Sequence, residues 1–472
     1  MPWSRTNFSP TWRIDPRAAA ILLRIGLGLG LAIGLAACTR RPPPPKNVVF
    51  ILVDTLRANH LGMYGYARPT SPGLDAFARS ASFFANARSQ ASCTFPSVNS
   101  ILTSRAPIAF LGQPNEAMGI PAQIPSLAEI LQARGFRTAA VSASPVVRKS
   151  PSRFNPHGGY ERGFESFQED CVWQPAECVN REARELLSQT KDQRPFFLYL
   201  HYIDPHGPYA PPPDYHRRFA TGHPDKDFIR NGDPNPIANF LYKGAPDPGV
   251  TPADIQFLID LYDDEIGHLD GQITALLADL RAAGRLDDTI VVFAADHGEE
   301  FLEHHNIKHC RTVFDTEIKV PLVFQIPGVA ARRIERPVQN LDIVPTLLDY
   351  LEIPTKGRAF DGRSLRALLE GTADKNAAED VQFSLMGTFR SVSDGHYKLI
   401  HDLATGSFVL YDLASDPGET RDVLPRERRA FHRLHPLLTA WLARTEGQGA
   451  ADESVRKGRE EIQKLRSLGY LE

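Results

Sequence analysis

The chain has 472 residues, which is enough for one large hydrophobic core with an appended smaller unit, or for two domains. Apolar residues make up 42% of the sequence, an ordinary share for a globular protein and too large a share for a disordered one. The formal net charge is -3 and no basic run is interleaved with aromatic residues, so the composition argues against nucleic acid as a partner.

Residues 1–38 have the layout of a secretion signal. Arg13, Arg17 and Arg24 precede the apolar run IGLGLGLAIGLAAC, which ends at Cys38 and is too short to cross a bilayer comfortably. The ending LAAC resembles a bacterial lipoprotein cleavage site, where the cysteine becomes the lipidated first residue of the mature chain. An uncleaved anchor helix is the alternative. Both interpretations predict a membrane-anchored, extracytoplasmic protein of the cell envelope, on the periplasmic side or at the cell surface.

Alternating helices and apolar strands follow a proline-rich linker at residues 39–46. NVVFILVDTLR is an apolar run typical of a strand buried on both faces. SLAEILQARGF then predicts an amphipathic helix and RTAAVSAS the next strand, and the same order recurs twice more, ending in RPFFLYLHYID and TIVVFAADHGEE. This order predicts an α/β fold in which helices flank a mostly parallel sheet.

Two further regions differ from this alternation. Residues 205–252 are rich in Pro, Gly, Asp and Asn, and a loop this long predicts an insertion that covers the site. After the main domain at 47–375, short strand patterns and the helical stretch RRAFHRLHPLLTAWLART predict a smaller C-terminal α+β subdomain at 376–450. Residues 451–472 form a tail.

Four cysteines follow Cys38. In an oxidising compartment Cys171 and Cys178 are close enough in sequence for a local disulfide. Cys93 and Cys310 each lie beside a candidate site residue, and spacing alone leaves their pairing open.

Two predicted strands end in residues suited to a metal site. Asp54 follows one strand and Asp296-His297 follows another, and ligands of parallel sheets bind at the carboxyl ends of the strands. A buried carboxylate is costly unless it is neutralised. Each aspartate could instead cap the following helix, but two of them with an adjacent histidine favour a metal site.

The stretch SCTFPSVNSILTS contains a candidate nucleophile. Pro96 suits the first turn of a helix, which places Thr94 at the helix N-terminus, where unpaired N–H groups favour an anion. A hydroxyl bound to a divalent cation could lose its proton there and attack phosphorus or sulfur. From this stretch alone, a simple helix cap is the better interpretation.

From about Lys46 to Glu419 the chain resembles the sulfatase family of the alkaline-phosphatase superfamily, which implies an ester hydrolase with an alkaline-phosphatase-like fold. The resemblance rests on the order and spacing of several stretches, each of them weak alone. These stretches are NVVFILVDTLRANHLGMYGY, SPGLDAFARSASFFANARSQAS, LHYIDPHGPYAPP, LYDDEIGHLDGQI, VVFAADHGEEFLEHH, VPLVFQIPG, VQNLDIVPTLLDYLEIP, DGRSLRALLEG and LYDLASDPGETRDV.

The chain departs from the family at the nucleophile. Classical sulfatases carry C-x-P-S/A-R, whose cysteine becomes formylglycine, and aligning Pro96 with this pattern puts Thr94 at that position. Cys93 lies one residue too early, and Val98 replaces the arginine. A formylglycine hydrate expels sulfate by returning to the aldehyde, whereas a sulfate ester of threonine cannot release its sulfate in this way. A phosphothreonine can instead be resolved by in-line attack, which favours a phosphoester over a sulfate ester as substrate.

The resemblance also implies a metal set. Superfamily members with a threonine nucleophile use an Asp or Glu, a Thr, an Asp and a His, and Asp54, Thr94, Asp296 and His297 match these positions. A nitrogen ligand favours Zn2+ or Mn2+ for the single divalent cation, with Ca2+ as the alternative.

Further roles follow from the same resemblance. His206 aligns with a substrate-contacting histidine, and His309 with the group that stabilises the transferred group or protonates the leaving oxygen. Three residues are candidates for binding the substrate or orienting the site: Arg57, Asp204 and His304. Asp204, or His304 with His305, could also bind a second cation, and the two histidines could equally be exposed loop residues.

The sequence thus predicts an extracytoplasmic, metal-dependent hydrolase of phosphate or sulfate esters, with Thr94 as nucleophile. One alternative is a transferase that passes a phospho-group to an envelope lipid or glycan. The other is a glycan-binding protein that keeps the fold without catalysis.

Overall fold

The computed structural model describes residues 45–110, 119–189, 194–215, 217–373 and 380–446. The lipoprotein-type signal with Cys38, nearly all of the proline-rich linker, the predicted border near residue 375 and the tail lie outside the described residues. None of the helices in the described part combines the length and apolarity that a membrane span needs.

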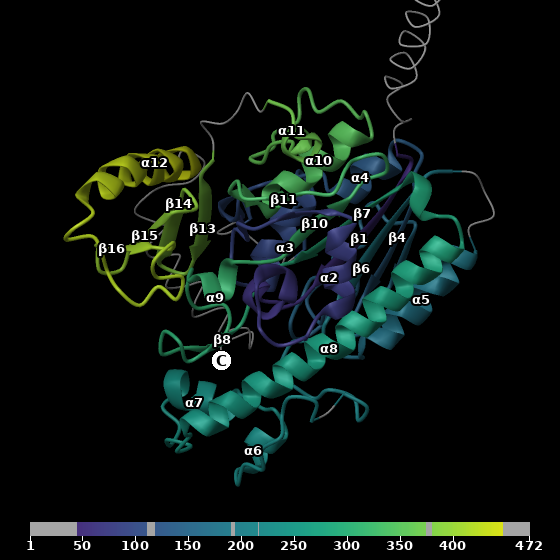
Figure 1. Cartoon of the computed structure of the whole chain (residues 1–472). Coiled ribbons are helices and arrows are strands. Elements are labelled where there is room, and N and C mark those ends of the chain that lie inside the picture. Colours follow the sequence, from purple (N-terminus) through teal and green to yellow (C-terminus); the bar gives the residue numbers. More distant parts are fainter. Residues whose placement is uncertain (1–44, 111–118, 190–193, 216, 374–379, 447–472) are drawn as a thin grey trace, which may run out of the picture. The chain divides into compact units, whose positions relative to one another are not determined.

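An eight-stranded, mostly parallel sheet organises the fold (Figure 1). The strand order is β11-β2-β10-β7-β1-β6-β4-β5, and only β10 runs antiparallel to its neighbours in this sheet. The strands are β1 (Asn47–Val53), β2 (Ser82–Phe84), β4 (Arg137–Ser142), β5 (Ser166–Gln168), β6 (Phe196–Tyr202), β7 (Thr289–Ala295), β10 (Leu322–Gln325) and β11 (Arg333–Ile334).

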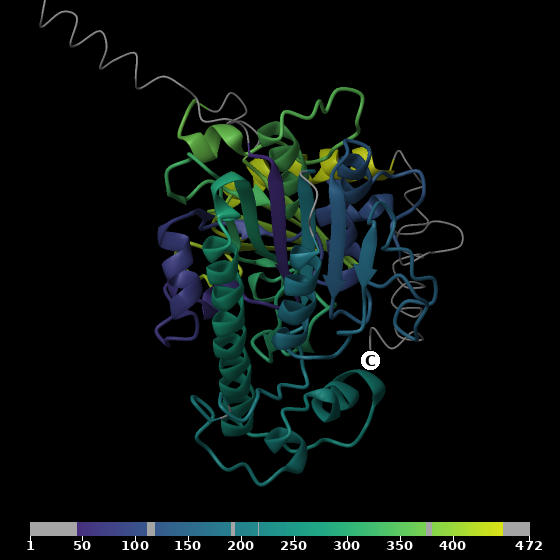
Figure 2. The same cartoon turned by 90° about the vertical axis from the view of Figure 1, so that its right-hand side faces the viewer.

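Both faces of this sheet are covered, which explains why β1 is apolar throughout. Val48, Phe50 and Leu52 of β1 pack into one apolar core, whereas the alternate residues Val49 and Ile51 pack into another. Helices contribute to both cores and lie on opposite sides of the sheet (Figure 2). One side has α2 (Pro72–Arg79), α5 (Ala176–Ser188) and α8 (Pro252–Ala282), and the other has α3 (Thr94–Thr103), α4 (Leu127–Gln132), α10 (Ile343–Tyr350) and α11 (Arg366–Glu370). The predicted α/β class is confirmed.

The 205–252 insertion contains two helices that its composition did not reveal. Tyr242 on α7 accepts a hydrogen bond from the backbone N–H of Ile307 (3.0 Å), and Lys308 reaches Asn235 at the start of α7 (2.9 Å). The insertion therefore packs on the small β8–β9 hairpin. The shorter elements are α6 (Asp227–Arg230), α7 (Asn235–Lys243), α9 (Asp315–Ile318), β3 (Ala87–Arg88), β8 (Glu300–Phe301), β9 (Ile307–Lys308) and β12 (Val338–Gln339).

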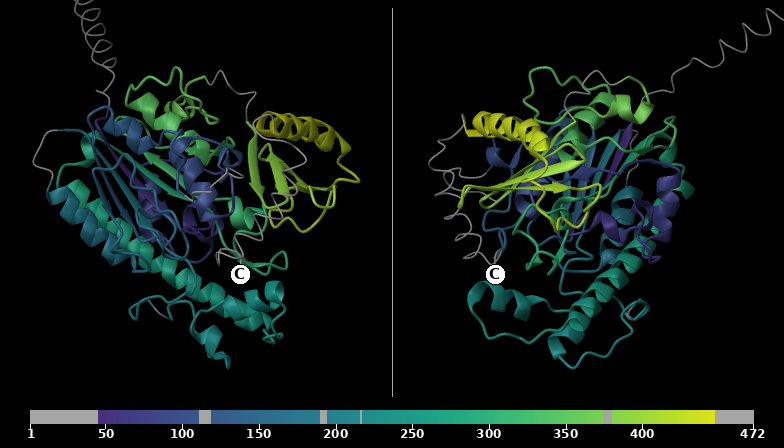
Figure 3. Two further views of the ribbon diagram at one scale, coloured as in Figure 1. Left: turned by 180° about the vertical axis from the view of Figure 1, so that it is seen from behind. Right: turned by 60° about the vertical axis from the view of Figure 1, so that its left-hand side comes forward.

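The C-terminal subdomain is a four-stranded antiparallel sheet with one helix packed on it, as predicted (Figure 3). Leu434, Leu438 and Trp441 of the helix share a small apolar core with Val392 and Leu399 of the sheet. The elements are β13 (Gln382–Met386), β14 (Phe389–Ser393), β15 (Tyr397–Asp402), β16 (Ser407–Asp412) and α12 (Arg428–Glu446).

A buried ion network joins this subdomain to the main sheet region. Asp315, at the start of α9, binds the Arg88 guanidinium through both carboxylate oxygens (2.8 and 2.6 Å) and the Lys398 ammonium on β15 (2.9 Å). Lys398 is fully buried and also pairs with Glu419 (2.8 Å). Burial raises the pKa of the Asp315 carboxyl, but Arg88 and Lys398 outweigh burial and hold this pKa well below its ordinary value.

We expect Asp315→Asn to lower the free energy of unfolding by about 3 kcal/mol at pH 7, because it leaves the buried Arg88 cation without its partner. The pKa of Asp315 is lower in the folded protein, so its stabilisation is present above pH about 4, the pKa of an unfolded aspartate, and is lost below it. Urea denaturation at pH 7 and pH 3 measures this effect. Asp279→Asn removes an exposed ion pair with Arg184 and should cost under about 1 kcal/mol. Equal losses in both variants would contradict the assignment.

Candidate active site

Three polar side chains converge at the carboxyl edge of the main sheet. Asp54 directly follows β1, Asp296 follows β7, and His201 lies near the end of β6. Since β1 runs between β6 and β7 in parallel register, with Leu52 opposite His201, these residues meet at one edge. One oxygen each from Asp54 and Asp296 and one nitrogen of His201 lie within 4.8 Å of one another. We call these three residues the Asp-His-Asp cluster.

The cluster fits a metal cation. Asp54 Oδ1, His201 Nε2 and Asp296 Oδ2 are buried and have no hydrogen-bond partner among the described residues. Asp296 Oδ1, in contrast, accepts from the backbone N–H groups of Thr55 and His297 (3.3 and 2.8 Å), which leaves Oδ2 as the free ligand atom. Burial raises the pKa of both carboxyls, and the charge of Asp296 raises that of Asp54 further. Unpaired polar atoms this deeply buried are costly, and a divalent cation would satisfy all three.

His201 was missed in the sequence analysis. It lies inside an otherwise apolar strand, FFLYLHY, and this one imidazole among apolar residues was the only feature of the strand that could have indicated a metal ligand. Its Nδ1 is 3.1 Å from the Tyr199 hydroxyl, which fixes the ring and leaves Nε2 facing the two aspartates. Burial lowers the pKa of His201 to about 3, so the ring is neutral, as metal binding requires.

Thr94 is the first residue of α3, and its hydroxyl contacts His297 beside the cluster. Oγ1 of Thr94 is 3.2 Å from Nε2 of His297. Nδ1 of His297 lies 2.9 Å from the Gly298 carbonyl, which can only accept, so Nδ1 carries the proton and Nε2 accepts from Thr94. The start of α3 is held against β7 because Ser97 donates to the Asp296 carbonyl (2.7 Å). His297 Nε2 is also 3.5 Å from Asp296, and the predicted set of Asp54, Thr94, Asp296 and His297 thus lies together.

A disulfide joins Cys93 to Cys310, which places Cys93 outside the chemistry of formylglycine. Cys93 precedes Thr94 and Cys310 follows His309, so this bond holds the two candidate catalytic segments side by side. The local bridge predicted between Cys171 and Cys178 is confirmed.

His309 and His206 lie next to His297. The ring centroid of His309 is 4.6 Å from that of His297 and 5.1 Å from that of His206. Nδ1 of His309 is 2.9 Å from the buried carboxylate of Glu299, a second residue that the sequence analysis missed. The sequence feature that could have pointed to Glu299 is its place in DHGEE, two residues after His297. Burial lowers the pKa of His309 well below its ordinary value and that of His206 to about 3, so both rings are neutral at pH 7.

The Arg57 side chain supports the site from outside the cluster. Its guanidinium binds the Glu303 carboxylate (2.6 Å) and the Glu299 carbonyl (3.0 Å). Arg57 therefore fastens the 299–303 segment, which carries the partner of His309, to the loop after β1.

The structure does not bring Asp204 and His304 into the cluster. Asp204 Oδ1 lies 3.6 Å from Nδ1 of His268 on α8. His304 pairs with Glu300 (3.0 Å), reaches the Gly418 carbonyl (3.0 Å) and stacks on the Phe314 ring at 3.7 Å. Its ring thus faces the C-terminal subdomain, and neighbouring His305 is exposed.

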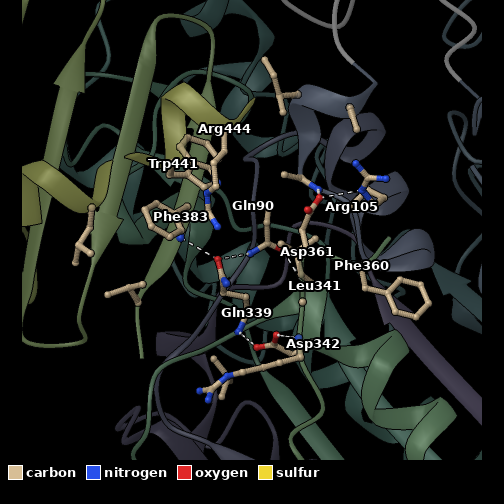
Figure 4. A pocket seen from close by; sticks show the side chains of 18 of the residues that line it. Gln90, Arg105, Gln339, Leu341, Asp342, Phe360, Asp361, Phe383, Trp441 and Arg444 are labelled. Carbon is tan, nitrogen blue, oxygen red and sulfur yellow. Dashed lines mark hydrogen bonds and ion pairs between the residues drawn. The ribbon is translucent and has the colours of Figure 1, made fainter. Parts of the chain in front are cut away.

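A cavity of about 750 Å3 lies between the C-terminal subdomain and segments 105–109, 337–342 and 360–363 (Figure 4). Gln90, Gln339 and Trp441 are among its lining residues, and no member of the Asp-His-Asp cluster lines it. The candidate active site is therefore identified by its chemistry and not by the volume of a cavity.

Comparisons with known proteins agree with this fold. The sulfatase family model matches residues 46–353, and the model of the C-terminal part of N-sulphoglucosamine sulphohydrolase matches 303–444. Human (Homo sapiens) N-sulphoglucosamine sulphohydrolase is 28% identical over 432 residues, which cover 82% of this chain and 77% of that protein. An ulvan-active sulfatase of Formosa agariphila is 25% identical over 435 residues, covering 85% of this chain and 81% of that protein.

Solved structures show the same fold. A phosphonate monoester hydrolase of Agrobacterium radiobacter superposes with a TM-score of 0.67 at 21% identity, covering 86% of this chain and 96% of that one. A protein solved with its substrate D-glucosamine-2-N,6-O-disulfate superposes with a TM-score of 0.70 at 18% identity, covering 87% and 100%. Because the sulfatase model spans well over half of the sequence, with Asp54, Thr94 and Asp296 inside the match, the chain belongs to the sulfatase family.

Proposed function

We propose that this sulfatase-family hydrolase is a metal-dependent phosphoesterase with Thr94 as nucleophile, and that sulfate esters are poorer substrates. One observation carries the proposal: the hydroxyl of Thr94 contacts His297, which lies against Asp54 and Asp296 of the cluster, whereas the sulfur of Cys93 is bonded to Cys310. Threonine cannot form the aldehyde on which classical sulfatases depend.

The Asp-His-Asp cluster with His297 would hold the cation. When bound, the cation would favour the deprotonated form of the Thr94 hydroxyl and offset negative charge on the transferred group. Two carboxylates with two imidazoles favour Zn2+ or Mn2+ over Ca2+, which prefers oxygen ligands alone.

The residues around Thr94 account for the rest of the reaction. Oγ1 of Thr94 forms a bond to phosphorus while the bond from phosphorus to the leaving alcohol breaks. The threonine proton leaves to solvent, because Nε2 of His297, 3.2 Å away, would be a ligand of the cation, and a proton must reach the leaving oxygen. His309, adjacent to His297 and oriented by Glu299, is placed to relay a proton from solvent to that oxygen. Water then attacks phosphorus, the bond to Thr94 breaks, and the threonine regains a proton.

The same segment offers a site for the transferred group. Thr94 is at the N-terminus of α3, a helix of 10 residues whose first N–H groups have no partners within the helix. These groups and the helix dipole stabilise negative charge next to the nucleophile.

An extracytoplasmic, membrane-anchored location is part of the proposal. The lipoprotein-like sequence at Cys38 and the two disulfides support it, because disulfides persist in oxidising compartments and are rare in the cytosol. The names of relatives and neighbours support a substrate with an anionic sulfur or phosphorus group: one is named for N-sulphoglucosamine and another is a phosphonate monoester hydrolase.

Turnover by the full-length protein in detergent tests this function. Metal-free protein would be supplied with Zn2+, Mn2+ or Ca2+ and assayed on nitrophenyl phosphate, bis-nitrophenyl phosphate and nitrophenyl sulfate. We expect turnover of a phosphoester with Zn2+ or Mn2+ to exceed that of the sulfate ester by at least about tenfold. Faster sulfate turnover would contradict the proposal. Failure to turn over any ester or to retain metal would favour the glycan-binding alternative.

A further inference from the structure

Trp173 combines unusual exposure with a strained backbone. Its side chain is 43% exposed, the largest value among the big apolar side chains that stand out as exposed in the described residues. Its φ angle is +60°, a left-handed conformation that is unfavourable for a bulky residue. Such a conformation persists only where the surroundings enforce it, and it is most often found at functional sites.

The surroundings of Trp173 enforce this conformation. The Cys171–Cys178 disulfide closes a short loop around the residue, and the backbone N–H of Trp173 donates to the Ala143 carbonyl (3.0 Å). Ala143 follows β4, and its own N–H donates to the His201 carbonyl (2.9 Å). Trp173 is therefore tied to the same carboxyl edge of the sheet as the Asp-His-Asp cluster.

The indole ring of Trp173 continues the row of histidine rings at the site. The ring centroids of Trp173 and His206 are 5.4 Å apart, and those of His206 and His309 are 5.1 Å apart. His309 in turn lies next to His297, the residue that contacts Thr94. On its other side Trp173 contacts the Phe154 ring at 5.9 Å. The exposed guanidinium of Arg153 lies 4.4 Å from the centre of that ring.

We propose that Trp173, Phe154 and Arg153 form a subsite for the alcohol portion of the ester, and that this portion is a sugar ring with an additional anionic group. This inference rests on the proposed function and names its substrate class. The partly negative faces of aromatic rings bind the apolar C–H face of a sugar ring, and exposed aromatic side chains are common binding anchors. Arg153 supplies a cation at the outer end of the subsite, where a sulfate or a carboxylate on the sugar, separate from the reacting phosphoester, would lie.

A structural role and a binding role for Trp173 predict opposite changes in stability. An exposed indole at positive φ adds little to the core, and asparagine adopts this backbone conformation more readily than tryptophan. Trp173→Asn should therefore leave the melting temperature unchanged or raise it while weakening the binding of the sugar. A residue needed for packing would instead lower the melting temperature when replaced.

Binding measurements on the full-length protein test the subsite. The Thr94→Ala background prevents turnover, and isothermal titration with Zn2+ present would use three probes: D-glucosamine-2-N,6-O-disulfate, nitrophenyl phosphate and inorganic phosphate. We expect Trp173→Asn to weaken binding of the sugar by about tenfold or more and binding of phosphate by less than about twofold. Trp441→Phe, in the separate cavity described above, should change neither.

The three probes separate the two proposals. Binding of phosphate without binding of the sugar, or equal loss of sugar and phosphate in Trp173→Asn, overturns the subsite and leaves the proposed function standing. Loss of nitrophenyl phosphate alone assigns the subsite to an aryl alcohol and overturns the sugar. Sugar binding that depends on Trp173 while phosphate fails to bind supports the subsite and argues against the phosphoesterase.

Discussion

Thr94→Ala is expected to lower phosphoester turnover by about a thousandfold or more, because it removes the atom that attacks phosphorus in the first step of the proposed reaction. Alanine is a good helix former and fits the first position of α3, so we expect the variant to fold normally. Steady-state kinetics on nitrophenyl phosphate, with metal content measured in parallel, would record the loss.

Thr94→Ser is the matched control. Serine keeps the hydroxyl that lies next to His297, and turnover within about tenfold of the parent protein is expected. If Thr94→Ala retained most of its turnover, water would be the direct nucleophile and Thr94 a helix-terminal residue. If Thr94→Ser were as inactive as Thr94→Ala, the methyl group or the local packing would be responsible, and the hydroxyl would lose its assigned role.

The second large effect concerns the metal-binding cluster. Asp54→Asn keeps the shape of the side chain but removes a charged ligand, and we expect it to weaken metal binding by about 100-fold or more. With metal bound, the parent should be more stable than Asp54→Asn. Without metal the variant should be the more stable of the two, because Asp54 and Asp296 are buried together and the charge of each makes ionisation of the other more costly. The variant should thus melt at a higher temperature than the parent in a chelator and at a lower temperature in excess Zn2+.

Differential scanning calorimetry in both conditions, with elemental analysis, tests this reversal. Asp204→Asn provides a control for metal content, since Asp204 lies beside His268 and outside the cluster. A metal content that falls with Asp204→Asn but not with Asp54→Asn would place the cation elsewhere. An Asp54→Asn variant that is less stable with and without metal would argue that the carboxylate is structural.

The residues that could be predicted from sequence are those whose position in an element has chemical meaning. Asp54 and Asp296 each follow an apolar strand, and the ends of parallel strands meet whatever the strand order is. His201 lies inside its strand, and only the register between β1 and β6 puts it opposite Leu52 and within reach of Asp54. Register depends on side-chain packing across the whole sheet, which one strand does not encode.

Contacts made by loops were the least predictable. Glu299 orients His309 because the 298–310 segment folds back on itself through the β8–β9 hairpin. The pairing of Cys93 with Cys310 depends on that same fold. Helices α6 and α7 in the 205–252 insertion are short, and α7 is bounded by Pro234 and Gly244, so their hydrophobic periodicity extends over too few residues to predict a helix.

The Cys93–Cys310 bond links positions 217 residues apart and therefore connects the start and the end of the catalytic region. In the chain-entropy description, closing a loop of this length stabilises the folded state by about 5 kcal/mol. For a protein exported as we propose, activity would begin only after this disulfide has formed. On that proposal the chain would leave the cytosol in reduced form, and the bond would hold the segments of Thr94 and His309 together only after residue 310 had crossed the membrane and met an oxidant. Oxidative maturation would then keep a phosphoesterase dormant among the phosphorylated metabolites of the cytosol and switch it on where its substrates lie.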